Sequence, residues 1–156
     1  MERIDEEFMR KALLLAKLAF DLGEAPIGAL VVNPQGDVIG RGFNQCEKRG
    51  TPLTHAEIIA IEDALAGNPP GLAKDGGFLH NCTLYVTLEP CLMCAGAIML
   101  ARLKRVVYGA YSDKNGALSS VANVYEHKFG YSPQIRGGIL ESECAELMSR
   151  FGNSLR

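Results

Sequence analysis

Two cysteines with metal-binding spacing are the first residues of this chain that point to chemistry. Cys91 and Cys94 occupy positions i and i+3 at the start of a segment, 91–102, that is predicted to be helical and directly follows Pro90. With this spacing both thiols lie on one side of the first helical turn, where the helix N-terminus favours the thiolate form that zinc binds. The pair alone leaves a zinc site, a redox dithiol and two buried thiols as alternatives.

His55 is the histidine best placed to complete a metal site. It follows Thr54 in a sequence with the spacing of a helix capping box, which predicts a helix over 56–66 with His55 at its start. His80 and His127 fall in predicted loops, where a hydrogen-bonding role is the simpler interpretation. A catalytic zinc site has three protein ligands and a position for water, whereas a structural site has four protein ligands. Because no further Cys or His matches, we predict an open site with one zinc ion per subunit.

Glu57 lies two residues after His55, near the predicted metal but spaced so that it need not bind it. A carboxylate there can take a proton from water and deliver it to a ring nitrogen and then to departing ammonia, while zinc makes hydroxide available near neutral pH. The alternative is structural, a hydrogen bond to the backbone of Thr54 as the second half of the capping box. Together, His-x-Glu and Pro-Cys-x-x-Cys form the signature of zinc-dependent nucleobase deaminases. We therefore predict Glu57 as the catalytic group.

An amphipathic helix is predicted near the N-terminus. Asp5 is expected to cap its start, and Gly23 to end it in the left-handed conformation. Its inward-facing stripe steps by four, three, four and three residues through Phe8, Ala12, Leu15, Ala19 and Leu22.

The remaining pattern alternates between strand and helix. Segments 27–32 and 38–43 predict a hairpin around the turn 33–36, and the Pro- and Gly-rich stretch 67–81 predicts a surface loop. Strands at 83–88 and 105–108 flank the helix 91–102, which predicts a parallel crossover, and a strand at 135–140 and a helix at 141–151 follow. We predict one domain, 1–156, with three α/β/α layers around a mixed, mainly parallel sheet of about five strands.

Composition limits the class of protein. The 156 residues, 47% hydrophobic and 22% charged, have an ordinary globular balance. The longest apolar run is interrupted by Lys17 and falls short of the roughly 20 residues that span a bilayer, and the acidic N-terminus does not match a secretory signal. We therefore expect a cytoplasmic protein without a membrane partner. Five cysteines, an odd number, favour free thiols.

Three stretches resemble the bacterial tRNA-specific adenosine deaminases of the cytidine deaminase superfamily: 55–57, 83–97 and 105–110. The resemblance runs from the first helix to about Gly116. It implies a cytidine deaminase-like fold, a homodimer, and conversion of the wobble adenosine of a tRNA anticodon loop to inosine. It also implies that Asn44 and Ala56 contribute to the substrate pocket, although Asn44 has an alternative role as a turn residue at the end of a strand.

The C-terminal third departs from this family. Ser112 stands where the family has an acidic residue, with Asp113 one position later, and the segment before the last strand reads Phe129-Gly130-Tyr131-Ser132.

The charge of the chain leaves a second function open. Lys and Arg contacts supply most nonspecific affinity for nucleic acid, yet the formal net charge is −2. The basic cluster Arg102, Lys104 and Arg105 is either an RNA contact or a solvated surface. The second hypothesis is therefore a deaminase of a free nucleobase or nucleoside, such as cytosine or guanine. The third hypothesis does not depend on charge: the zinc site is structural, and the domain is a non-enzymatic zinc-binding module.

Overall fold

A five-stranded sheet forms the centre of the computed structural model, which describes residues 1–67 and 78–152. The strand order is β2-β1-β3-β4-β5. The strands are β1 (Gly28–Val32), β2 (Val38–Phe43), β3 (Thr83–Leu88), β4 (Arg105–Ala110) and β5 (Gln134–Arg136). β1 is antiparallel to both of its neighbours, and β3, β4 and β5 pair in parallel, so every strand except β1 runs in the same direction. The predicted mixed, mainly parallel sheet is confirmed.

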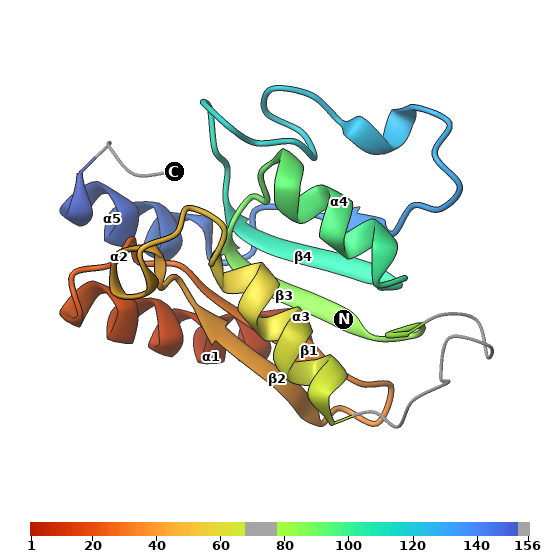
Figure 1. Cartoon of the computed structure of the whole chain (residues 1–156), viewed down its shortest axis with the longest axis horizontal. Coiled ribbons are helices and arrows are strands. Elements are labelled where there is room, and N and C mark those ends of the chain that lie inside the picture. Colours follow the sequence, from red (N-terminus) through yellow and green to blue (C-terminus); the bar gives the residue numbers. More distant parts are fainter. Residues whose placement is uncertain (68–77, 153–156) are drawn as a thin grey trace.

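Helices cover both faces of this sheet (Figure 1). α1 (Glu2–Asp21) and α5 (Glu141–Phe151) lie on one face and contact each other, and α3 (Ala56–Ala66) and α4 (Leu92–Leu100) lie together on the other face. The three predicted layers are therefore present. Two short elements have no counterpart in the sequence prediction, α2 (Cys46–Arg49) and the 3-10 helix η2 (Val124–Glu126).

Gly42 explains how closely α3 approaches the sheet. A Cβ at this position in β2 would collide with the backbone of Ala56 and Ala60. Glycine therefore allows the first turn of α3 to lie directly against the end of β2. The residues at the start of α3 are thereby fixed relative to the sheet.

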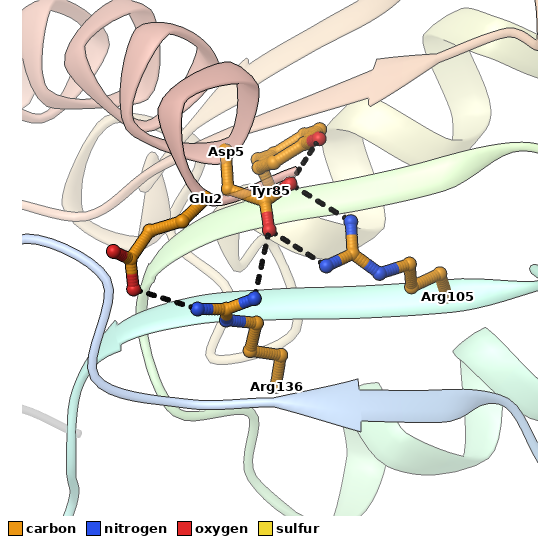
Figure 2. A network of polar contacts seen from close by, with 5 residues as sticks. All are labelled: Glu2, Asp5, Tyr85, Arg105 and Arg136. Carbon is orange, nitrogen blue, oxygen red and sulfur yellow. Dashed lines mark hydrogen bonds and ion pairs between the residues drawn. The ribbon is translucent and has the colours of Figure 1, made fainter.

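The predicted cap at Asp5 is wrong. α1 begins at Glu2 with Met1 as its N-cap, and Asp5 lies fully buried inside the helix. Its carboxylate accepts hydrogen bonds from both terminal nitrogens of Arg105, at 2.8 and 2.6 Å, and from the hydroxyl of Tyr85 at 2.8 Å (Figure 2). Asp5 faces the sheet because its partners on β3 and β4 satisfy it there better than a helix terminus would.

Arg136 extends this network toward the surface. One terminal nitrogen lies 3.9 Å from Asp5, and the other donates to Glu2 at 2.7 Å (Figure 2). Burial by itself raises the pKa of Asp5, but the hydrogen bonds from Arg105 and Tyr85 and the charges of both arginines outweigh it and lower that pKa. Burial and the bond to Asp5 raise the pKa of Tyr85.

Other predicted elements agree closely with the structure. The hairpin, β3 and α5 match their predicted ranges to within one residue, and Gly23 has the expected left-handed conformation, with φ of +78°. The predicted helix 91–102 is shorter at both ends, as α4. Leu22 is exposed rather than inward-facing, because α1 ends at Asp21.

The last strand is shorter than the predicted 135–140. β5 ends at Arg136 because Gly138 and Leu140 adopt left-handed conformations, with φ of +87° and +54°, which an extended strand cannot contain. Of the predicted loop 67–81, residues 68–77 lie outside the described residues. Among the described helices, none combines the length and the apolar character that crossing a bilayer requires.

Candidate zinc and catalytic site

Three predicted metal ligands meet between the N-termini of α3 and α4. His55 is the N-cap residue of α3, Cys91 is the N-cap residue of α4, and Cys94 lies in the first turn of α4. Nδ1 of His55 is 3.5 Å from the Sγ atoms of both Cys91 and Cys94, and the three ligand atoms lie within 4.8 Å of one another. Residues 36 and 39 positions apart in the chain are thus brought to one point.

The geometry of these three atoms fits zinc. Tetrahedral zinc with bonds of about 2.3 Å to sulfur and about 2.0 Å to nitrogen separates the ligand nitrogen and sulfur by about 3.5 Å. The observed separations of 3.5 Å match this value. One imidazole and two thiols are also a donor set that zinc prefers. The structure therefore positions His55, Cys91 and Cys94 to bind a metal ion, as the sequence predicts.

Backbone hydrogen bonds fix the ligands at the helix starts. The carbonyl of His55 accepts from the N–H of Ile59 at 3.1 Å, and the carbonyl of Cys91 accepts from the N–H of Ala95 at 2.8 Å. His55 and Cys91 therefore each begin the hydrogen-bond ladder of a helix. The positive ends of both helix dipoles face the site, which favours thiolates there.

Glu57 is fully buried in the first turn of α3, two residues beyond His55. Thr54 does not take the capping role that the sequence predicts. His55 is the N-cap residue of α3, and no side chain caps the start of this helix. The hydroxyl of Thr54 instead donates to the carbonyl of Thr51 at 3.4 Å. The structure therefore places a buried carboxylate within one helical turn of a metal ligand.

Asn44 lies directly after β2 and beside the start of α3. The N–H of its neighbour Gln45 donates to the carbonyl of Thr54 at 3.1 Å, which joins this segment to the residue before His55. Asn44 is only 2% exposed, and its Oδ1 accepts no hydrogen bond from the part of the chain that the structure describes. A buried acceptor without a donor costs about 1–3 kcal/mol. This favours the substrate interpretation of Asn44 over the turn interpretation.

Comparison with known proteins identifies the family. Residues 2–110 match the family model described as the cytidine and deoxycytidylate deaminase zinc-binding region. The chain belongs to this deaminase family. A Haemophilus influenzae protein named tRNA-specific adenosine deaminase is 43% identical over 148 residues, which cover 94% of the deaminase described here and 82% of that protein.

A solved structure and a longer protein extend the comparison. The structure comes from a study of A-to-I editing by tRNA:A34 deaminases, and it matches the deaminase with a TM-score of 0.80 and 39% identity over 90% of this chain and 98% of that chain. A Deinococcus radiodurans protein named tRNA(Ile)-lysidine synthase is 40% identical over 148 residues, and the deaminase spans 24% of its length. The predicted resemblance and the cytidine deaminase-like fold are confirmed.

Two buried glutamates of the deaminase were missed by sequence reasoning. Glu24 is 2% exposed and accepts hydrogen bonds from the N–H groups of Glu47 and Lys48, at 3.0 and 2.7 Å. It therefore fixes α2, the short helix that lies between Asn44 and His55 in the chain. Glu89, directly after β3, is 1% exposed. Burial raises its pKa, but hydrogen bonds from a following loop outweigh this effect and lower it. The sequence held one signal for Glu89: it is a single acidic residue between an apolar predicted strand and Pro90-Cys91.

The basic cluster of the deaminase is not a uniform surface. Arg105 is tied to Asp5, and its side chain is only 14% exposed. The guanidinium of Arg102 lies 5.2 Å from the ring centre of Tyr131, and Lys104 is exposed. Interpreting all three residues as solvated, or all three as an RNA contact, is wrong for Arg105, because its partner comes from the distant helix α1.

Proposed function

We propose that this deaminase converts adenosine to inosine at the wobble position of a tRNA anticodon loop. The observation that carries deamination is the convergence of His55 with Cys91 and Cys94, with Glu57 buried one helical turn away. The likeness of almost the whole chain to tRNA-specific adenosine deaminases supports the choice of substrate. An adenosine in an anticodon loop is accessible to such a site because an unpaired base can be turned out of its stack at low cost.

The site residues would divide the chemistry as follows. His55, Cys91 and Cys94 would hold one zinc ion, which supplies Lewis-acid chemistry that makes hydroxide available near neutral pH. Glu57 would take one proton of the attacking water on a carboxylate oxygen and deliver it to N1 of the base. It would then take the second water proton and deliver it to the amino group, which leaves as ammonia when the C6–N bond breaks and the C6–O bond remains.

Asn44 and Ala56 would orient the base. Oδ1 of Asn44 would accept a hydrogen bond from a substrate donor, which would satisfy this buried oxygen. Ala56 is the first residue of α3, so its N–H has no acceptor within the helix and is available to a substrate acceptor.

A direct assay tests the substrate. Purified protein is incubated with an anticodon stem-loop that carries adenosine at the wobble position, and in parallel with free adenosine, cytosine, guanine and their nucleosides. We expect inosine in the stem-loop. Ammonia released from free heterocycles, with no inosine in the stem-loop, would overturn the proposal.

The second candidate is deamination of a free nucleobase or nucleoside. The specific observation in its favour is the charge: the net charge is −2, and Arg105 and Arg136 are paired with Asp5 and Glu2. The charges of these two arginines are therefore partly neutralised, which makes them less able to bind RNA phosphates. The same assay decides between the two candidates.

A homodimer would cover the exposed face of α4. This helix, Leu-Met-Cys-Ala-Gly-Ala-Ile-Met-Leu, has no charged residue, yet Leu92 and Leu100 are 69% and 71% exposed. Helices that are apolar on all sides are typically buried. A second copy of the chain would bury this face. Sedimentation of the native protein should give twice the chain mass. Leu100→Glu should give a monomer. A monomeric native protein would refute the dimer.

Residues 1–156 would act as one deaminase domain in the cytoplasm. Cys46, Cys82 and Cys144 form no disulfide with another described residue. Free thiols are typical of a reducing compartment.

A further inference from the structure

We propose that Glu89 is a positioning residue, whose carboxylate holds the loop 112–120 against the metal-binding turn and thereby fixes one wall of the substrate pocket. This inference rests on the proposed function for its substrate. It concerns a side chain that does not itself need to touch the base.

The carboxylate of Glu89 binds both ends of this loop. Oε1 accepts hydrogen bonds from the N–H of Ser112, at 3.1 Å, and from the hydroxyl of Ser120. Oε2 accepts from three consecutive N–H groups, those of Leu118 at 3.2 Å, Ser119 at 2.8 Å and Ser120 at 3.0 Å. Hydrogen bonds to a charged, buried acceptor are among the stronger ones in proteins. One side chain therefore closes the loop.

The loop is joined to the metal-binding turn on both sides. The N–H of Ala117 donates to the carbonyl of Pro90, the residue before Cys91, at 2.9 Å. Beyond the loop, the hydroxyl of Tyr125 donates to the carbonyl of Ala95, the residue after Cys94, at 2.7 Å. Figure 1 shows this segment leaving β4 and running beside α4. A shift of the loop would therefore move the backbone next to the metal ligands.

The start of the loop also borders an open hollow. Ser112 and Asp113 line it together with Met148 and Ser149 of α5, and its volume is about 400 Å³. It lies at the ends of β3 and β4, since Leu88 and Ala110 also line it. None of His55, Glu57 and Asn44 lines this hollow, so it would take a neighbouring nucleotide of a stem-loop and not the reacting base. Holding Ser112 in place would therefore matter more for a stem-loop than for a single nucleoside.

Gly116 supports the same interpretation from the other side of the carboxylate. A Cβ at this position would collide with Cδ and both carboxylate oxygens of Glu89. Glycine leaves the space that the carboxylate occupies. Gly116→Ala should therefore displace Glu89 from its donors without removing any of them.

Glu89→Gln disrupts the hydrogen bonds between the carboxylate and the loop more directly. Both oxygens of Glu89 accept from backbone N–H groups. An amide has one oxygen and one NH₂ group, so in either orientation the NH₂ group would face at least one N–H donor. The glutamine therefore cannot replace the carboxylate.

The test combines hydrogen exchange with kinetics on full-length protein loaded with zinc. Glu89→Gln and Gly116→Ala are compared with Gly130→Ala, a control in which the added Cβ meets nothing within 4 Å. We expect the amides of Ser112, Leu118, Ser119 and Ser120 to exchange about tenfold faster or more in both test variants.

The kinetic expectation separates positioning from general damage. In both test variants the KM for the anticodon stem-loop should rise about tenfold or more, with kcat within about threefold of the wild-type value and one zinc per chain. The double variant should be no worse than the worse single variant, because both changes break the same contact. The control should behave as wild type.

Several results would overturn the proposal. They are unchanged exchange of the loop amides, faster exchange with an unchanged KM, or loss of zinc in both variants, which would mean that Glu89 supports the cysteines instead. If Glu89→Gln fails to fold, Gly116→Ala still gives the answer. A wild-type protein that makes no inosine would instead refute the proposed substrate, and the exchange result would still decide whether Glu89 holds the loop.

Discussion

Replacing Asp5 with asparagine tests the buried network beneath α1. The change keeps the size of the side chain but removes the charge that faces Arg105 at 2.6 and 2.8 Å. Asp5 is fully buried, whereas the side chains of Arg105 and Arg136 are 14% and 35% exposed. The variant therefore leaves two cations near a neutral partner, with only partial access to water.

The expected loss of stability follows from these exposures. Breaking a fully buried ion pair by removing one partner costs about 3–5 kcal/mol. Because water reaches both arginines, we expect about 2–4 kcal/mol for Asp5→Asn. For a domain of this size each kcal/mol lowers Tm by about 2–4 °C, so a loss of 3 kcal/mol corresponds to about 6–12 °C.

The pH dependence gives a second, independent signature. The folded-state pKa of Asp5 is lowered below its unfolded value of about 3.9, so the ion pair stabilises the protein at higher pH. That stabilisation is lost as the pH falls through the folded-state pKa. The difference in unfolding free energy between wild type and Asp5→Asn should therefore be constant from about pH 5 to pH 8 and shrink below about pH 4.

Urea denaturation followed by circular dichroism measures both quantities. Glu143→Gln is the matched control, because Glu143 pairs with Arg10 at 3.6 Å on the surface, and breaking this pair should cost at most about 1 kcal/mol. If Asp5→Asn costs no more than the control, or if its effect does not depend on pH below 4, the network does not stabilise the fold as argued.

Two further predictions concern the site. Glu57→Gln should lower kcat by about 10²–10⁴-fold with zinc content and melting unchanged, and deamination at the wild-type rate would remove Glu57 from the chemistry. Asn44→Ala should raise the KM for the stem-loop by about two- to tenfold, the value of one hydrogen bond, while its unfolding free energy in urea should not fall, because the variant removes a buried acceptor that has no donor. A large loss of stability with an unchanged KM would instead mean that Asn44 is a turn residue.

Local patterns made part of this structure predictable. The apolar run of β3 and the stripe of α5 depend on residues close in sequence, and both elements have the predicted ranges. The metal ligands were predictable because the spacing of Cys91 and Cys94 and the helix start at His55 each follow from local geometry. That His55 lies 3.5 Å from both cysteines required the fold to bring the starts of α3 and α4 together.

The misassigned residues have distant partners. Asp5 has the local pattern of a helix cap, but its partners Tyr85 and Arg105 are 80 and 100 residues away in the chain. Glu89 likewise binds a loop 23–31 residues away. Propensity and spacing describe neighbours along the chain, whereas buried polar groups are paired by the fold. The acidic residues that the structure places inside were therefore the hardest to predict.

X-ray absorption at the zinc edge is the most direct test of the central claim. For protein purified with one zinc per chain, we expect two sulfur ligands at about 2.3 Å and two nitrogen or oxygen ligands at about 2.0 Å, one of them water. The sulfur count should fall to one when Cys91 is replaced by serine. A site with four protein ligands, or zinc that remains bound with unchanged coordination in Cys91→Ser, would contradict the account.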